Sequence, residues 1–182
     1  MHFRSLFTIS AIHIAAAVIT AVLFSPTTQS TNAQYAQCET KLLASDSAEY
    51  DPFGWSISIS GDVAIIGDWD HSHDGIWSGT AYIARFDGTN WVEEAELFPS
   101  DAESNDYYGW SVSISGDVAV VSSRWDDDKG IESGSVYVYR YDGVNWIEEA
   151  KLLASDGAKS NSFGESVCIS GDVVVIGAVG HE

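Results

Sequence analysis

The chain has few basic residues and few cysteines. Its 182 residues include eight lysines and arginines against 27 aspartates and glutamates, which gives a formal charge of −19. Such an acidic surface repels phosphate backbones and anionic lipid headgroups, so nucleic acid and anionic membranes are disfavoured as partners. The charge is compatible with cations as ligands. The favoured alternative to cation binding is that the acidic residues only keep the protein soluble and monomeric. The two cysteines are too few for a disulfide framework.

Sequence motifs of catalysis are also missing. There is no Gly-x-Ser-x-Gly elbow, phosphate-binding loop or zinc-hydrolase motif. Two of the five histidines lie near the N-terminus, which leaves His71, His73 and His181. The carboxylates are so numerous that none stands out as an acid–base pair. We therefore expect that the chain is not an enzyme.

Helical periodicity is absent beyond the N-terminal segment, and a 55-residue repeat takes its place. Residues 41–95 and 96–150, aligned without a gap, share 27 identities in 55 positions. A fixed period of this size is typical of repeat architectures, in which each unit buries its faces against its neighbours.

Each repeat reads as four short strands. Residues 55–60 alternate apolar and polar side chains, Gly61-Asp62 suits a hairpin turn, and 63–66 is apolar on both faces, as in a covered interior strand. The β-rich runs 79–86 and 91–98 complete the unit. Segment 148–153 contains good helix formers, but its counterpart is followed by Pro99, which favours an edge strand.

These features predict an all-β fold of tandem four-stranded antiparallel blades, forming part of a β-propeller. We expect repeats at 41–95 and 96–150, a truncated repeat at 151–182 and a short linker at 34–40. Residues 34–182 supply about 2.7 repeats, whereas propellers close with four to eight blades. The sequence stops inside a repeat, which favours a fragment of a longer gene over blades completed by another chain.

The N-terminal 33 residues predict an export signal. Arg4 precedes a mostly apolar run, and small residues up to Ala33 suit a signal peptidase. Cleavage there would leave a charge of −20, because only Arg4 is lost. An uncleaved membrane anchor is the alternative, since the apolar run is long.

The repeats resemble a known family. Phe53-Gly54, Tyr108-Gly109 and Phe163-Gly164 stand before the first strand of a repeat, and 177–180 reads Gly-Ala-Val-Gly after the second. This pattern is similar to the FG-GAP repeat of integrin-type propellers and secreted bacterial proteins. The resemblance implies propeller blades, an extracellular setting and a role in adhesion or ligand binding. It does not carry calcium binding over, because the integrin calcium loop is absent in that form from all three repeats.

Two loops that do not repeat, 68–78 and 123–133, are the candidate functional segments. They hold the same place in successive repeats, so we expect them side by side on one face. Each carries three aspartates, whose hard oxygens suit calcium, and solvated turn residues are the favoured alternative. The candidate metal ligands are Asp68, Asp70, Asp74, Asp126, Asp127 and Asp128.

Other side chains of these loops suggest further ligands. His71 and His73 fit zinc or copper only weakly, because no third histidine or cysteine is near, and exposed loop histidines are favoured instead. Trp69, Trp77 and Trp125 could stack on sugar rings, or could pack against the adjacent loop.

Residues that recur at the repeat period are interpreted as scaffold. Four further tryptophans recur in this way, and we therefore expect them, as named below, to lie in the core. Cys168 stands where the other repeats carry serine, at a small inward position, which favours a buried free thiol over a bridge to Cys38. The four tryptophans are Trp55, Trp91, Trp110 and Trp146.

Taken as a whole, the sequence predicts a secreted, non-enzymatic module for extracellular binding or adhesion. The expected ligand is an extracellular protein or a carbohydrate, with no membrane contact after signal cleavage. Two alternatives stay open: a structural piece of a surface assembly, and a non-catalytic part of a larger polysaccharide-active enzyme.

Overall fold

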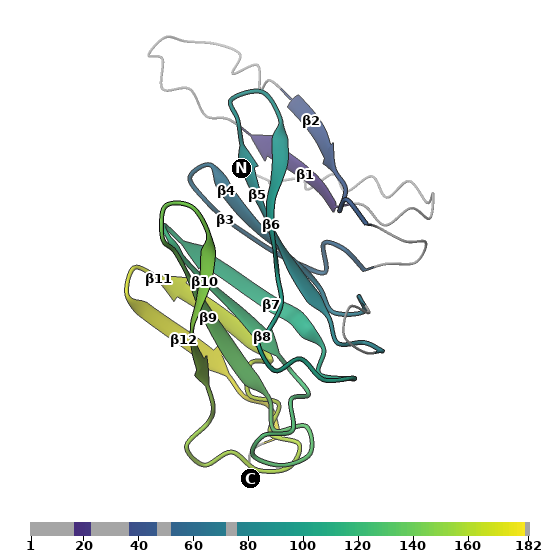
Figure 1. The fold of residues 1–182 in the computed structure, drawn as a ribbon, viewed down its shortest axis with the longest axis vertical. Coiled ribbons are helices and arrows are strands. Elements are labelled where there is room, and N and C mark those ends of the chain that lie inside the picture. Colours follow the sequence, from purple (N-terminus) through teal and green to yellow (C-terminus); the bar gives the residue numbers. More distant parts are fainter. Residues whose placement is uncertain (1–16, 23–36, 47–51, 72–75, 181–182) are drawn as a thin grey trace, which may run out of the picture.

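Two complete four-stranded blades form the centre of the molecule (Figure 1). The computed structural model describes residues 17–22, 37–46, 52–71 and 76–180. Both blades are antiparallel meanders, which confirms the predicted all-β fold, and segments 91–98 and 146–153 are strands as expected. Blade 1 consists of β3 (Ser56–Ser60), β4 (Val63–Asp68), β5 (Thr80–Phe86) and β6 (Trp91–Leu97). Blade 2 consists of β7 (Tyr108–Ser115), β8 (Val118–Ser123), β9 (Ser135–Tyr141) and β10 (Trp146–Leu152).

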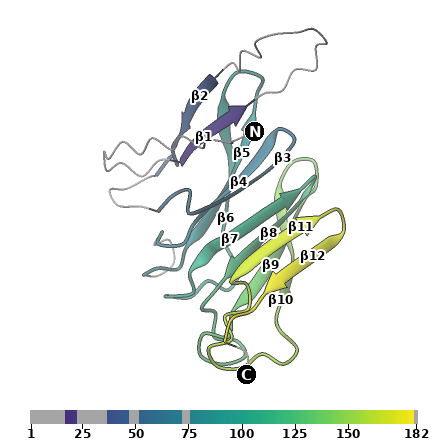
Figure 2. The same ribbon diagram turned by 180° about the vertical axis from the view of Figure 1, so that it is seen from behind.

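A two-stranded sheet flanks the blades at each end (Figure 2). β11 (Ser166–Ser170) and β12 (Val173–Gly177) form a hairpin beside blade 2. β1 (Ala17–Val22) pairs with β2 (Gln37–Leu42) beside blade 1. β1 falls within the predicted export signal, which stays a prediction, and β2 begins within the expected linker. In the described ranges, no helix has the length and apolar character needed to span a membrane.

The predicted hairpin turns occur where Gly-Asp pairs join the first two strands of each repeat. Gly61, Gly116 and Gly171 have φ values of 63°, 57° and 56°. A Cβ at any of the three would meet no atom within 4 Å. The need for glycine therefore comes from the positive φ itself, which L side chains adopt only at a cost.

β4 is buried on both faces, as its continuous apolar sequence predicts. Val63 and Ile65 face blade 2 and belong to the core between the blades. Ala64 and Ile66 face the other way, where they pack with Tyr82 and residues around β2. The core between the blades comprises Val63, Ile65, Ala81, Ile83, Leu97, Tyr108, Val112, Ile114, Ala119, Val121, Tyr137 and Tyr139.

Serine hydroxyls join the first strand of each blade to the first strand of the next. We call this set of hydrogen bonds the serine ladder. These strands lie at the edge of their sheets, where unpaired backbone N–H groups need another acceptor. The bonds run from Val112 N to Ser56 Oγ (3.0 Å), Ile114 N to Ser58 Oγ (3.2 Å), Gly116 N to Ser60 Oγ (3.0 Å), Val167 N to Ser111 Oγ (3.1 Å), Ile169 N to Ser113 Oγ (3.1 Å) and Gly171 N to Ser115 Oγ (3.0 Å).

The backbones of the two blades also approach each other at Gly109. Its φ is 83°, and a Cβ there would lie 2.1 Å from the carbonyl oxygen of Thr80 and 2.9 Å from the amide nitrogen of Asp68. Glycine at this position lets β7 dock on the ends of β4 and β5, because any side chain would collide with backbone.

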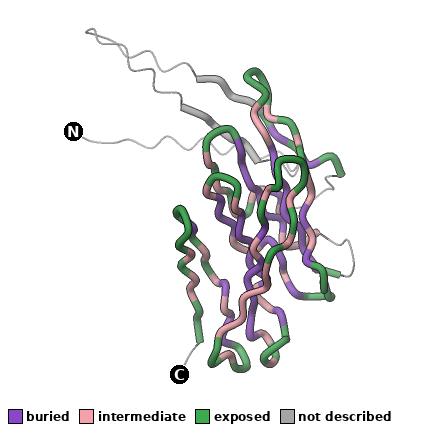
Figure 3. Tube along the Cα trace, turned by 60° about the vertical axis from the view of Figure 1, so that its left-hand side comes forward, coloured by how far each residue is buried: buried purple, intermediate pink, exposed green. Residues whose placement is uncertain are grey.

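Two sequence-based interpretations were wrong. Trp55 is not in the core: 54% of it is exposed, and its ring contacts Trp69 and Trp110, which belong to none of the core clusters. Cys168 is free and exposed rather than buried. Its counterpart Ser113 is buried because β11 covers it, whereas no described strand covers the same side of β11 (Figure 3). Position in a repeat predicts which way a side chain points, but burial also needs a neighbour.

The serine ladder generates a stability prediction. We expect Ser113→Ala to lower the free energy of unfolding by about 1–3 kcal/mol, because it leaves the N–H of buried Ile169 without an acceptor. Ser115→Ala is the matched control, since its partner Gly171 is exposed and water can replace the hydroxyl. Urea unfolding measures both variants. An unchanged stability of Ser113→Ala, or a loss no larger than that of Ser115→Ala, would contradict the prediction.

Candidate functional site

Each loop between the second and third strands is hydrogen bonded to the segment that leads into the next blade. In blade 1, the carbonyls of Ile76, Trp77 and Ser78 accept the N–H groups of Asn105, Tyr107 and Tyr108. Blade 2 repeats the pattern with carbonyls 131–133 and N–H groups 160, 162 and 163. The two candidate loops therefore have the same backbone frame but different side chains.

The three predicted sugar-stacking tryptophans all contact one residue, Tyr107. The ring centroids of Trp69, Trp77 and Trp125 lie 4.9, 6.1 and 4.3 Å from that of Tyr107, and Trp125 is stacked on it at 22°. The guanidinium of Arg124 lies over the ring of Trp110 at 4.4 Å. We call the whole group the aromatic cluster: Trp55, Trp69, Trp77, Tyr107, Trp110 and Trp125.

The aromatic cluster combines exposed rings with an unusual backbone. Trp77 is 43% exposed, and both Trp77 and Tyr107 have positive φ, at 58° and 54°. Such a conformation costs on the order of 1–3 kcal/mol in a bulky residue. Glu132 and Ser162 have positive φ at the same repeat positions, with values of 58° and 44°. The strained backbone thus belongs to the repeat, and blade 1 uses it to present aromatic rings.

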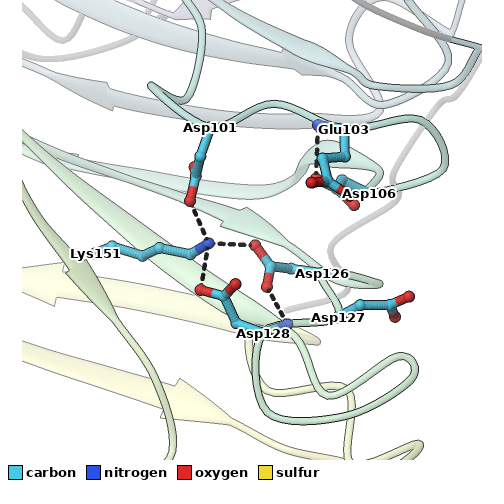
Figure 4. A pocket seen from close by; sticks show the side chains of 7 residues that line it. All are labelled: Asp101, Glu103, Asp106, Asp126, Asp127, Asp128 and Lys151. Atoms are coloured by element: carbon cyan, nitrogen blue, oxygen red, sulfur yellow. Dashed lines mark hydrogen bonds and ion pairs between the residues drawn. The ribbon is translucent and has the colours of Figure 1, made fainter.

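A second feature is an acidic pocket of about 400 Å³ on blade 2 (Figure 4). The ammonium of Lys151 is at its centre, with Nζ 2.7 Å from Asp101 Oδ2, 2.7 Å from Asp126 Oδ2 and 2.8 Å from Asp128 Oδ2. The pocket is lined by Asp101, Glu103, Asp106, Asp126, Asp127, Asp128 and Lys151.

The charges of the acidic pocket shift one another's pKa values. Burial opposes ionisation of Lys151, but hydrogen bonds to three aspartates outweigh it and raise its pKa. Burial likewise acts against the charge of Asp101, while hydrogen bonds from Lys151 and Tyr137 give a net lowering of its pKa. Asp106 is different: burial, helped by the charge of Asp126, raises its pKa to about 7. The pocket therefore holds a carboxyl that titrates near neutral pH.

The six aspartates predicted as calcium ligands do not form one described group. Asp68 is fully buried at the end of β4, and Asp74 lies outside the described residues. Asp126 and Asp128 contact Lys151, and Asp127 Oδ1 accepts the N–H of Glu132 at 2.6 Å. Asp70 follows β4 and is half-buried. Calcium binding at these residues stays a prediction.

Sequence reasoning missed two residues that organise these sites, Tyr107 and Lys151. Lys151 carried a signal, since the repeat has an acid, Glu96, at the equivalent position. Tyr107 carried none, because nothing in the sequence shows that it meets both loops.

Comparison with known proteins agrees with this architecture. The family model for the FG-GAP repeat matches residues 37–84, 91–139 and 146–182. The chain belongs to the FG-GAP repeat family. A comparison with curated proteins gave no match. As FG-GAP repeats, blades 1 and 2 are units of a β-propeller-type module, a class often involved in ligand binding.

The FG-GAP assignment gives the motif glycines a physical meaning. Gly54, Gly109 and Gly164 have φ values of 93°, 83° and 93°. A Cβ on Gly164 would lie 2.8 Å from Cβ of Ser122 and 2.9 Å from the carbonyl oxygen of Ser135, in the preceding blade. The FG glycine is therefore the point at which one FG-GAP blade meets the backbone of the one before it.

The acidic pocket predicts a strong dependence on its single lysine. We expect Lys151→Met to lower the free energy of unfolding by about 1–3 kcal/mol, because three aspartates lose their shared counterion. Lys159→Met, at an exposed site, should change it by less than about 0.5 kcal/mol. Chemical denaturation compares the two. An unchanged free energy of unfolding in Lys151→Met would mean that the three ion pairs make no net contribution to stability.

The raised pKa of Asp106 predicts a pH dependence. Between its ordinary pKa of 3.8 and about 7, the folded state holds a proton that the unfolded state has lost, so stability falls as pH rises through this window. Asp106→Asn removes this loss and keeps an oxygen to accept the N–H of Glu103. We expect the variant to match the wild type near pH 4 and to exceed it by up to about 4 kcal/mol at pH 8, at about 1.36 kcal/mol for each unit by which the pKa is raised. Urea unfolding at both pH values tests this, and a pH-independent difference would contradict it.

Proposed function

We propose that this chain is a secreted, non-enzymatic binding module that recognises carbohydrate through the aromatic cluster. The observation that carries the proposal is the convergence of Trp69, Trp77 and Trp125 on Tyr107. These tryptophans come from loops that do not repeat, so they are specific to their blades and are not required by the fold.

The chemistry of the aromatic cluster suits a sugar. Aromatic faces offer apolar contact to the C–H faces of pyranose rings, with a polar edge nearby. Arg124 lies over Trp110 and 5.8 Å from the ring centroid of Trp125, and Arg124 is also paired with Glu165 at 2.6 Å. Charged hydrogen-bonding groups thus border the stacking surface, as in binding sites where a few polar groups orient the ligand.

The charge of the chain supports a neutral ligand. At −19 the protein repels polyanions, including nucleic acid and acidic polysaccharide. The extracellular setting rests on the predicted export signal, and an adhesive role rests on the family. Calcium binding by aspartates of the two loops is a separate proposal and is not part of the sugar contact.

Titration with neutral oligosaccharides tests the proposal. The probes are cello-, xylo-, manno- and chito-hexaose. Binding is measured by the change in tryptophan fluorescence. We expect at least one to bind with a saturating signal, and Trp77→Ala and Trp125→Ala each to weaken binding by about tenfold, as loss of one stacked ring implies.

Trp91→Phe is the matched control. Trp91 lies on β6 and packs on Phe86, away from the aromatic cluster, and phenylalanine keeps that ring contact. It should leave the affinity unchanged. Absence of binding to all four probes, or equal affinities in the Trp77 and Trp125 variants and the wild type, would overturn the proposal.

A further inference from the structure

Three metal-ligating side chains meet on blade 1, outside the aromatic cluster and the acidic pocket. Asp46 follows β2, His71 lies between β4 and β5, and Glu96 is near the end of β6. Within the described ranges, one ligand atom from each of these residues lies within 4.8 Å of the other two. Nε2 of His71 is 3.3 Å from Oδ2 of Asp46. Asp46 is exposed and the other two are half-buried, so the group is open to solvent.

Neighbouring residues hold each of the three ligands in place. The hydroxyl of Tyr82 donates to Oδ1 of Asp46 at 2.9 Å, and that of Thr80 donates to Oε1 of Glu96 at 3.3 Å. The carbonyl of His71 accepts the N–H of Gly79 at 2.8 Å, which fixes the loop. Hydrogen bonds of this kind to the ligands orient a metal site.

The residue before Asp46 is also fixed. Ser45 donates its N–H and its hydroxyl to the two carboxylate oxygens of Glu93, at 2.9 and 3.0 Å. Ser100 and Glu148 make the same pair of bonds on blade 2, both at 2.9 Å. The two blades therefore present their aspartates, Asp46 and Asp101, in the same way.

In blade 2 the equivalent positions hold a positive charge. At the repeat offset of 55, Asp46, His71 and Glu96 correspond to Asp101, Asp126 and Lys151. There the Lys151 ammonium is bound by aspartate oxygens at 2.7–2.8 Å. Tyr137, the counterpart of Tyr82, donates to Asp101 at 2.7 Å, as Tyr82 does to Asp46. Blade 2 thus carries its own cation at this position, where blade 1 has an anion and an imidazole instead.

From this comparison we infer that Asp46, His71 and Glu96 bind a divalent transition-metal ion, with Zn²⁺ the best-suited common one. Imidazole nitrogen disfavours Ca²⁺ and Mg²⁺ and suits zinc, while two carboxylates complete a set of three protein ligands. With bonds of about 2.0–2.2 Å, tetrahedral ligand atoms lie about 3.4 Å apart. The 3.3 Å between His71 Nε2 and Asp46 Oδ2 already matches this spacing, and the other separations, at most 4.8 Å, would shorten on binding. The fourth position is left for water or a ligand.

Binding of Zn²⁺ to the full chain after chelator treatment tests the inference. Isothermal titration calorimetry should give one site, and Co²⁺ should give a visible absorption band when it replaces Zn²⁺. We expect Glu96→Gln and His71→Ala each to weaken Zn²⁺ binding at least tenfold. Glu149→Gln is the charge-matched control: it removes one acid that pairs with Arg140 on blade 2, and should leave the affinity within twofold.

Two further variants exchange residues between blade 1 and blade 2, so that the test does not depend on loss of binding alone. Glu96→Lys copies Lys151, so it should abolish Zn²⁺ binding without lowering the melting temperature. The pair Asp126→His with Lys151→Glu copies blade 1 onto blade 2 and should raise the stoichiometry from one to two. No saturable Zn²⁺ binding to the wild type, or unchanged binding in folded Glu96→Lys, would overturn the inference.

Discussion

The serine ladder is the constraint on which the rest of the structure depends. A strand at the edge of a sheet has N–H groups that must find acceptors, and here every second one finds a serine hydroxyl of the preceding blade. The bonds join residues 56 apart in a repeat of 55, so each serine reaches the residue just after its own counterpart. This one-residue step fixes the position of each blade on the last. It also requires a small polar residue at alternate positions of β3 and β7.

Blades placed in this way superimpose their loop positions, and side chains there can change while the backbone does not. The positive φ angles show this, because Trp77 and Glu132 share one conformation with very different side chains. The same holds at the ligand positions, where Glu96 and Lys151 have opposite charges. Their neighbours Tyr82 and Tyr137 make equivalent hydrogen bonds to aspartate. The side chains at these positions thus differ between blades while the backbone conformation and its hydrogen bonds to the next blade are shared.

Much of the fold followed from the sequence because it is local and repeated. Alternation, the Gly61-Asp62 type of turn and the apolar β4 each specify a strand or a turn from a few residues. The errors at Trp55 and Cys168 came from neighbours, since an internal repeat cannot show which faces a further blade covers. The sites were harder for a related reason. The loop sequences identify the aspartates and tryptophans, but not the residues from other segments, such as Lys151, that contact them.

The repeat itself contains information that analysis of single loops does not use. Most positions of the 55-residue unit keep their residue type, so a position where charge reverses between blades marks a change in what the site must bind. A buried or half-buried carboxylate group needs a counterion, because desolvated like charges repel. On blade 2 the chain supplies that counterion as Lys151. On blade 1 the same position is Glu96, which adds to the repulsion, and His71 provides an imidazole nitrogen. Glu96 in place of Lys151, and His71 in place of Asp126, therefore change a site that contains its own cation into one suited to bind a metal ion from solution.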